Sequence, residues 1–252
     1  MRWTERQHAM LEAMGVRVFE SPGQSAPAQT APARVAPQPQ APRPEASVVA
    51  APASSRPEID TLDWPALREA VSSCRACALC ESRTQTVFGV GHERAHWMVI
   101  GEAPGENEDA QGEPFVGAAG QLLDNMLRAL GLSRRDAPPE QSVFIANTLK
   151  CRPPRNRNPE PGEMAQCAPF LARQIELVAP RVSLAMGRFA AQALLASDEP
   201  IGRLRGRLHA WRGIPVVVTY HPAYLLRTLA DKARAWDDLC LAASVLEVDR
   251  PT

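Results

Sequence analysis

Short apolar runs alternate with segments of helical periodicity through most of this chain, and that alternation most constrains its fold. Four runs are apolar along nearly their whole length, as strands buried on both faces of a sheet are: 97–100, 143–146, 181–186 and 215–220. Each is followed by a helix-like segment, which is typical of a parallel sheet covered by helices. The sequence therefore predicts an α/β fold, a three-layer α/β/α sandwich with a four-stranded parallel central sheet.

The helical segments are expected from the spacing of their apolar residues and from the residues that can cap them. The expected helices span 62–73, 120–130, 163–178, 187–196 and 231–246. Asp60 or Thr61 could cap the first helix, and Gly131 closes the second.

Composition divides the chain at about residue 58. Residues 1–20 have the spacing of a short amphipathic helix. Residues 21–57 are rich in Pro, Ala, Gln and Ser, so they cannot bury enough apolar surface to fold and are expected to form a disordered linker. We expect residues 58–252 to form the folded domain and residues 1–57 to tether a protein partner.

Charge and hydropathy narrow the class of protein. The formal net charge is zero, which argues against a protein that coats nucleic acid through bulk positive charge. Basic residues nevertheless cluster at 150–157 and 203–212, where phosphate binding and an ordinary solvated face are equally good interpretations. The sequence has no apolar run of the roughly 18 residues that span a bilayer and no apolar signal core near its start. We expect a monomeric, cytoplasmic protein without a membrane partner.

The stretch 101–120, GEAPGENEDAQGEPFVGAAG, follows the first predicted strand. Connections from a strand to a helix usually need about two to six residues, so this stretch is too long for a plain joint. Ligands of α/β proteins bind at the carboxyl ends of the strands. We therefore expect a functional site at this edge of the sheet.

Polar residues also follow the later predicted strands, in Asn147-Thr-Leu-Lys150, Gly187-Arg188 and His221-Pro-Ala-Tyr224. With Phe115 they could form a base-sized pocket, because an aromatic face and an amide together hold and read a planar heterocycle. A nearby imidazole could stabilise charge on a leaving group. Each residue alone is more often a core or turn residue, so the prediction rests on their convergence.

Six cysteines offer a candidate metal site. Cys74 and Cys77 form a CxxC, Cys151 follows a predicted strand, and Cys167 lies in a predicted helix. One tight pair is a poor fit to a zinc ribbon, whereas scattered thiolates can hold an iron–sulfur cluster. Buried free thiols remain the alternative. Cys80 makes a second CxxC with Cys77 and competes with Cys74, and Cys240 is left over.

Three long motifs resemble a known family. GEAPGENEDAQGEPFVGAAGQLLDNML, NTLKCRPPRNRNP and TYHPAYLLR, preceded by CRAC, are similar to segments of the family 4 uracil-DNA glycosylases. The resemblance covers about residues 70–245 and implies that 58–252 is a uracil-DNA glycosylase-like catalytic domain. It implies hydrolysis of the N-glycosidic bond of deoxyuridine in DNA, which releases uracil and leaves an abasic site for base-excision repair.

The resemblance implies roles in the pocket. Phe115 would stack on the flipped uracil, Asn147 would read its O4 and N3–H edge, and His221 would bond O2 and stabilise the departing anion. Glu102 and Ala103 would line the pocket. Glu108 would crowd C5 and so exclude thymine.

The same resemblance implies contacts to DNA and a cofactor. Arg152 and Arg155 would contact DNA, and Tyr224-Leu225-Leu226-Arg227 would wedge into it. A [4Fe–4S] cluster would be held by Cys74, Cys77, Cys151 and Cys167. Arg83 stands six residues after Cys77, as in the family, and this favours Cys74 over Cys80.

Some expectations stay open at this point. Some relatives carry an aspartate that activates water where this chain has Ala103, so Glu102 and Asp109 are both candidates for that task. Segment 205–209 superficially resembles the basic loop of a branch that bonds covalently to DNA, but it precedes the last predicted strand. The rival functions are a non-catalytic iron–sulfur DNA-binding module and a glycosylase for other deaminated bases.

Overall fold

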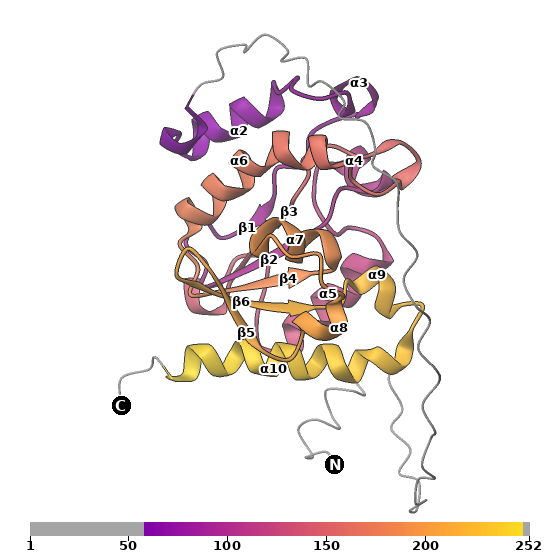
Figure 1. Ribbon diagram of the computed structural model, residues 1–252. Helices are drawn as coiled ribbons and strands as arrows, with labels where there is room; N and C mark the ends of the chain where they lie inside the picture. The colour runs from indigo at the N-terminus through magenta and orange to yellow at the C-terminus, as the bar shows by residue number, and fades with distance from the viewer. Residues whose placement is uncertain (1–57, 249–252) are drawn as a thin grey trace, which may run out of the picture.

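The computed structural model describes residues 58–248 (Figure 1). The helix expected at 1–20 and the linker expected at 21–57 lie outside the described residues. Within 58–248 no helix is long and apolar enough to cross a membrane.

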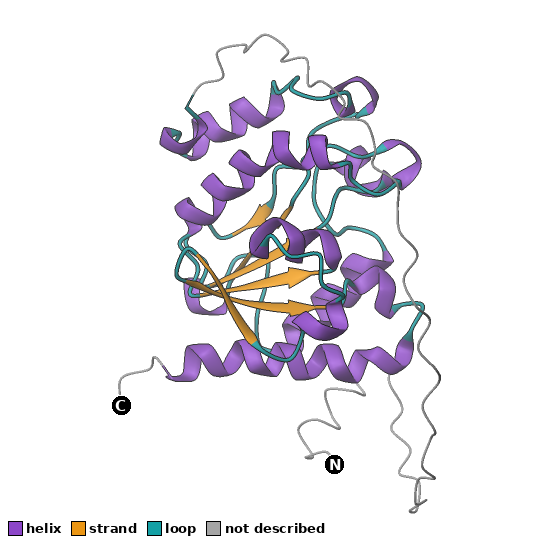
Figure 2. Cartoon of the chain, in the orientation of Figure 1, coloured by secondary structure: helices purple, strands orange, loops and turns teal. Residues whose placement is uncertain are grey.

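A mixed sheet of six strands, in the order β1-β3-β2-β4-β6-β5, forms the middle layer (Figure 2). Its strands are β1 (Val90–Gly91), β2 (Trp97–Gly101), β3 (Val143–Asn147), β4 (Val182–Met186), β5 (Leu208–Trp211) and β6 (Ile214–Thr219). β2 pairs in parallel with β3 and β4, and β4 pairs in parallel with β6. β1 and β5 add antiparallel edges.

The sheet is therefore larger than the four-stranded sheet that was predicted. β1 has only two residues, and the residues of β5 alternate between exposed and half-buried. Neither edge strand carries the continuous apolar run that marks a buried strand, so apolar runs could not reveal them.

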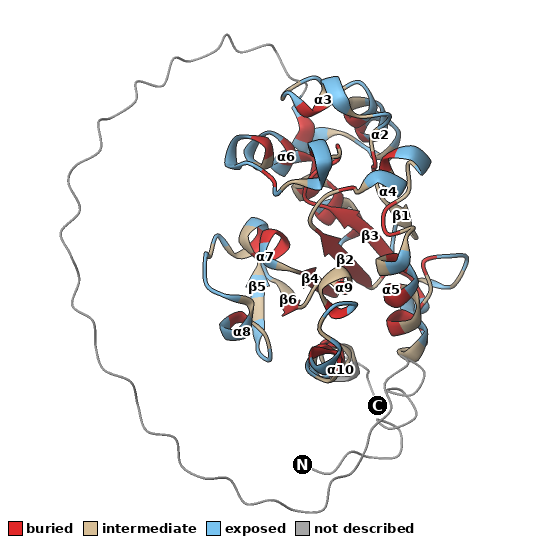
Figure 3. Ribbon diagram, turned by 90° about the vertical axis from the view of Figure 1, so that its right-hand side faces the viewer, coloured by how far each residue is buried: buried red, intermediate tan, exposed pale blue. Residues whose placement is uncertain are grey.

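Helices cover both faces of the sheet, because successive side chains of a strand point to opposite faces. α5 (Ala118–Ala129) and α10 (Lys232–Val248) cover the face that contains Val99 and Ile145. α2 (Trp64–Ser72), α6 (Pro161–Val178) and α7 (Arg188–Leu195) cover the face that contains Met98 and Phe144. Figure 3 shows the central strands as the most deeply buried part of the fold.

These five helices lie within a few residues of their predicted bounds, but the first has a different cap. The carboxylate of Asp63 accepts a hydrogen bond from the backbone N–H of Ala66 at 3.0 Å. Asp60 and Thr61, the predicted caps, belong instead to a separate turn, η1 (Ile59–Thr61).

Short helical turns connect the larger elements. They are α3 (Leu79–Ser82), α4 (Glu106–Gln111), η2 (Pro139–Gln141), η3 (Pro154–Asn156), α8 (Ile201–Leu204), α9 (Pro222–Leu225) and η4 (Leu229–Asp231). The stretch 101–120, expected as one long loop, thus contains α4. The acidic residues of that stretch favour the amino end of a helix, where they complement its dipole.

Candidate active site

A cavity of about 200 Å³ opens where the parallel strands end. It is lined by Glu102, Ala103, Pro104, Gly105, Glu108, Phe115, Ala119, Asn147, Pro153, Asn156, Arg157, His221 and Ala223. All six predicted uracil-contacting residues are in this set. A larger cavity of about 590 Å³ beside α6 and α7 holds none of them. We place the site in the smaller cavity because the amide, the aromatic ring and the imidazole meet there.

Gly101 brings the amide and the aromatic ring together. It is the last residue of β2 and pairs with Asn147, the last residue of β3. A Cβ atom on Gly101 would lie 2.4 Å from Oδ1 of Asn147 and 2.6 Å from Cζ of Phe115. A side chain at this position would therefore clash with both the amide and the aromatic ring.

Phe115 is held in a backbone conformation that L-residues seldom adopt, with φ of 56°. Nη1 of the buried Arg134 donates to the carbonyl oxygens of Pro114, at 2.8 Å, and Phe115, at 3.2 Å. Gly120 allows close approach, since a Cβ there would lie 1.7 Å from the Phe115 carbonyl oxygen. Arg134 and Gly120 together fix the aromatic ring, and neither was predicted from the sequence.

The Asn147 side chain is free to read a ligand. The residue is 2% exposed, and within residues 58–248 its side-chain amide has no hydrogen-bond partner. The amide is not among the fully buried polar atoms that lack a partner, so it faces the open space of the cavity. A ligand that offers one donor and one acceptor side by side would satisfy both ends of it.

His221 presents a neutral imidazole. Burial lowers the pKa of His221 to about 4, against the opposing influence of Glu108. Nδ1 accepts a hydrogen bond from the backbone N–H of Ala223 at 3.2 Å, which assigns the ring proton to Nε2. The ring stacks on Phe115, with centroids 5.3 Å apart and planes inclined by 27°. The neutral ring therefore has a donor, Nε2–H, that the backbone does not use.

The three carboxylates Glu102, Glu108 and Asp109 of the first motif have different environments and hydrogen-bond partners. Glu108 accepts hydrogen bonds from the backbone N–H of Gly105, at 3.1 Å, and of Val116, at 3.0 Å. It therefore links the residue before α4 to the segment that follows this helix. Burial raises the pKa of Glu102, which lines the cavity, and Arg188 opposes that rise. Asp109 is buried and accepts from the backbone N–H of Thr84 through both oxygens. Asp109 thus serves the fold, and Glu102 is the better candidate to act on water.

The predicted DNA wedge is divided between surface and core. Leu226 is 42% exposed, and Arg227 is exposed. Leu225, the last residue of α9, is 1% exposed and packs in the core, and its contact with DNA stays a prediction. The Tyr224 hydroxyl donates to Asp231 at 2.7 Å, which leaves Leu226 as the apolar tip.

The two clusters of basic residues are only partly available for phosphates. Arg155 is exposed, whereas Arg152 bonds Asn156 at 2.8 Å. Lys150 is 2% exposed and cannot reach a phosphate. In the second cluster, Arg205 pairs with the buried Asp238 at 3.0 Å. Arg212 pairs with Glu176 at 2.6 Å but remains largely exposed.

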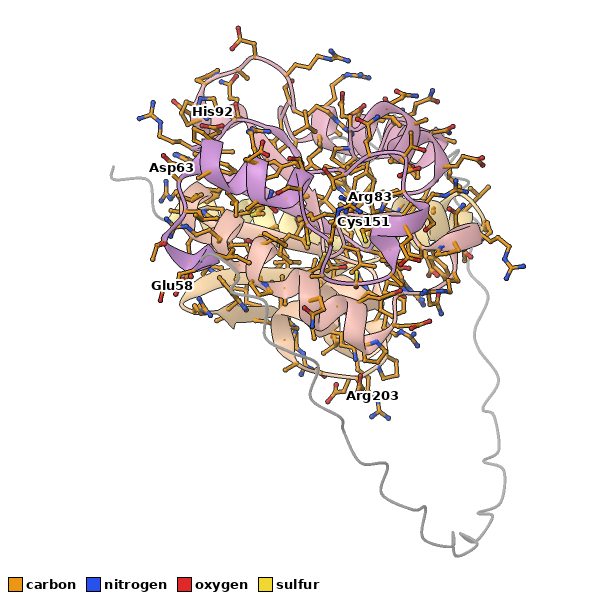
Figure 4. All side chains as sticks on the ribbon, turned by 90° about the horizontal axis from the view of Figure 1, so that it is seen from above. Glu58, Asp63, Arg83, His92, Cys151 and Arg203 are labelled. Carbon is orange, nitrogen blue, oxygen red and sulfur yellow. The ribbon has the colours of Figure 1, made fainter. Side chains whose placement is uncertain are left out.

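Five cysteines lie around one small space near the carboxyl end of β3. Cys74, Cys77, Cys80, Cys151 and Cys167 line one small cavity between α2, α3 and α6. Burial is the main cause that raises the pKa of Cys167, to about 11, and that of Cys151. Nη1 of Arg83 lies 3.1 Å from Sγ of Cys151 (Figure 4), an arrangement that suits a thiolate.

The fit of these cysteines to a metal depends on the metal. Among the described residues no three donor side chains converge as a single ion would require. Cys74, Cys77, Cys151 and Cys167 all interact electrostatically with at least one other member of this set across the cavity. Cys80 lines the same cavity as these four. Scattered thiolates around one space suit a polynuclear cluster better than zinc.

Comparison with known proteins identifies the family. Residues 88–240 match the model of the uracil DNA glycosylase superfamily. The chain belongs to the uracil-DNA glycosylase superfamily. It is similar to type-4 uracil-DNA glycosylases of Archaeoglobus fulgidus, with 44% identity over 62% of this chain and 79% of the relative, and of Saccharolobus solfataricus, with 44% identity over 67% and 78%. A type-4 enzyme of Pyrobaculum aerophilum is 40% identical over 71% of this chain and 93% of the relative.

Within this superfamily fold, the cavity has walls that the sequence analysis missed. Asn156 and Arg157 line it opposite the first motif, and Arg157 is held by Glu163 through two hydrogen bonds, at 2.9 and 2.6 Å. Asn156 and Arg155 both have positive φ, of 55°. The Pro-rich motif around them was the available signal, but it did not indicate which residues turn toward the pocket.

Proposed function

We propose that this chain is a type-4 uracil-DNA glycosylase, which hydrolyses the N-glycosidic bond of deoxyuridine in DNA and leaves an abasic site for base-excision repair. The observation that carries the proposal is that Phe115, Asn147 and His221 line one cavity. The names of the type-4 relatives support the same reaction. A binding module without chemistry has no need for all three groups.

Recognition begins with a base taken out of the stack. Extruding it costs a few kcal/mol, least where it is mispaired or single-stranded. The ring then lies against Phe115, and Asn147 donates to O4 and accepts from N3–H. Cytosine reverses that donor and acceptor pattern, so it would leave the buried amide of Asn147 unpaired, which discriminates strongly. Glu108 holds the loop in place near C5, which leaves no room for the methyl group of thymine.

Bond cleavage places negative charge on the departing uracil. His221, neutral because it is buried, donates from Nε2 to O2 as that charge develops. A fixed donor in a site shielded from water stabilises such charge more in the transition state than in the ground state. Glu102 orients the attacking water, and its raised pKa is consistent with a carboxylate in a dry site.

The cofactor is a [4Fe–4S] cluster held by Cys74, Cys77, Cys151 and Cys167. Their placement around one cavity and the Arg83 hydrogen bond to Cys151 support this set. A cluster held there would tie the α2–α3 connection, the end of β3 and α6 together and so stabilise the fold.

Leu226 enters the duplex where the base leaves, and Arg152, Arg155 and Arg227 contact phosphates. Residues 58–252 form the catalytic domain, which works as a monomer in the cytoplasm. Residues 1–57 tether a protein partner. Unchanged repair in cells that express only residues 58–252 would count against that last proposal.

The purified full chain should release uracil from a uracil-containing oligonucleotide and should contain about four irons. Asn147→Ala and His221→Ala should each lower kcat severely while circular dichroism shows an intact fold. Competition among uracil, hypoxanthine and xanthine substrates separates this activity from a glycosylase for other deaminated bases. An iron-containing protein with no abasic product would instead support the non-catalytic module.

A further inference from the structure

Lys150 lies between the cysteine cavity and the uracil pocket. It is fully buried, and it lines the cysteine cavity together with Cys151 and Cys167. Its Nζ donates to the carbonyl oxygen of Asn147 at 2.7 Å and to Oε1 of Gln174 at 2.6 Å. The Lys150 side chain therefore contacts Asn147, while the same residue lines the cysteine cavity.

Gln174, which accepts from the Lys150 ammonium, is itself held in place. Gln174 lies in α6 and is 0% exposed. Its Nε2 donates to the carbonyl oxygen of Phe88 at 2.9 Å. The chain of hydrogen bonds thus runs from Phe88 through Gln174 and Lys150 to Asn147, and it fixes the end of β3 against α6.

The ammonium lacks a carboxylate partner among the residues 58–248, since both of its acceptors are neutral. An unpaired buried cation costs several kcal/mol. The groups that interact with it electrostatically are Cys167 and Cys151. Metal ligation requires these thiols as thiolates, and that would supply the missing negative charge.

We propose that Lys150 is a positioning residue that joins the two sites: its charge balances the cysteine-ligated cluster, and its hydrogen bond to the Asn147 carbonyl oxygen fixes the uracil-reading amide. The inference rests on the proposed function, since it requires both the cluster and the role of Asn147. A merely structural lysine would affect stability without changing the electronic properties of the cluster.

Lys150→Met tests both halves in the full-length, iron-loaded protein. A nearby cation favours the reduced, more negative cluster, so its loss should make the reduction potential more negative. The freed end of β3 should raise the inhibition constant of free uracil by about tenfold, which corresponds to about 1.4 kcal/mol.

Arg83→Met is the matched comparison, because Arg83 bonds Cys151 and the Ser72 carbonyl oxygen but not Asn147. It should also lower the potential while changing the inhibition constant by less than about twofold, a difference below ~0.5 kcal/mol. If Lys150→Met does not retain iron, Gln174→Glu is the second variant. It places a carboxylate beside the Lys150 ammonium, and this negative charge should lower the reduction potential of the cluster with little change in side-chain size.

The outcomes are distinct. A lower potential together with weaker uracil inhibition in Lys150→Met, and a lower potential alone in Arg83→Met, support the inference. An active, iron-containing wild type whose Lys150→Met and Gln174→Glu variants keep the wild-type potential overturns it and leaves the proposed function intact. A wild type without iron or without uracil release refutes the proposed function itself.

Discussion

The imidazole of His221 stacks on the ring of Phe115, with centroids 5.3 Å apart. Burial lowers the pKa of His221 to about 4, and Arg227 adds to this effect whereas Glu108 opposes it. The ring therefore stays neutral through the whole range in which an ordinary histidine, with a pKa near 6.5, would take up a proton.

Stability should consequently depend on His221 at mildly acidic pH. Unfolding restores an ordinary pKa, so between about pH 6.5 and 4 the unfolded chain binds the extra proton and the folded state loses stability as pH falls. From pH 7 to about pH 5 this loss amounts to about 2 kcal/mol. Urea unfolding of the wild type and of His221→Gln at both pH values checks it. An equal decline in both proteins contradicts the assignment.

Gly101→Ala should inactivate the enzyme. The added Cβ would displace the Asn147 amide or the Phe115 ring, and a displacement of about 1 Å can cost roughly 100-fold in rate. We expect at least that loss in kcat/KM for uracil release. Gly162→Ala is the control, because a Cβ at Gly162 meets nothing within 4 Å, and its activity should match the wild type. Near-normal activity in Gly101→Ala would show that the active site is not in this cavity.

Arg134→Met should loosen Phe115. The change leaves the carbonyl oxygens of Pro114 and Phe115 without their donor, at a cost of about 2–4 kcal/mol in the free energy of unfolding. Free uracil should also inhibit the variant more weakly. Arg128→Met is the control, since the exposed Arg128 side chain donates to Asn125 at 2.9 Å, and surface changes usually stay within about 0.5 kcal/mol. Equal unfolding free energies for both variants would refute the stabilising role of the Arg134 hydrogen bonds.

Cys151→Ala should abolish iron binding, whereas Cys80→Ala should retain it. Both thiols line the same cavity, but the family resemblance assigns Cys151, and not Cys80, to the four ligands. Iron and sulfide analysis of the purified variants measures the difference. Loss of iron in Cys80→Ala with retention in a Cys74→Ala variant would reverse the assignment and make Cys77 and Cys80 the paired ligands.

Chelation of the cluster from the wild type should lower its melting temperature. The cysteines come from the α2–α3 connection, the end of β3 and α6, so a cluster held by them would link three separate parts of the chain. Binding of a group to the folded state alone stabilises it by mass action. The same treatment of Cys151→Ala should cause no further change, and an unchanged wild-type melting temperature would contradict a structural role.

The sequence alone determined which segments form the core and which residues end the strands. Buried strands such as 97–101 and 143–147 are apolar throughout, and that pattern is local. Parallel strands bring their carboxyl ends to one edge, so Asn147 and His221 could be expected to lie near the first motif before any coordinates were known. The family motifs supplied the chemical roles.

Only the tertiary structure decided how those residues are held. Arg134 lies nineteen residues after Phe115 and bonds its carbonyl oxygen, and Lys150 turns inward although its basic neighbours suggested a phosphate-binding face. Leu225 and Leu226 are adjacent and chemically alike, yet one is in the core and the other in solvent. Burial and the partners that satisfy buried groups depend on contacts between distant segments, which local patterns do not contain.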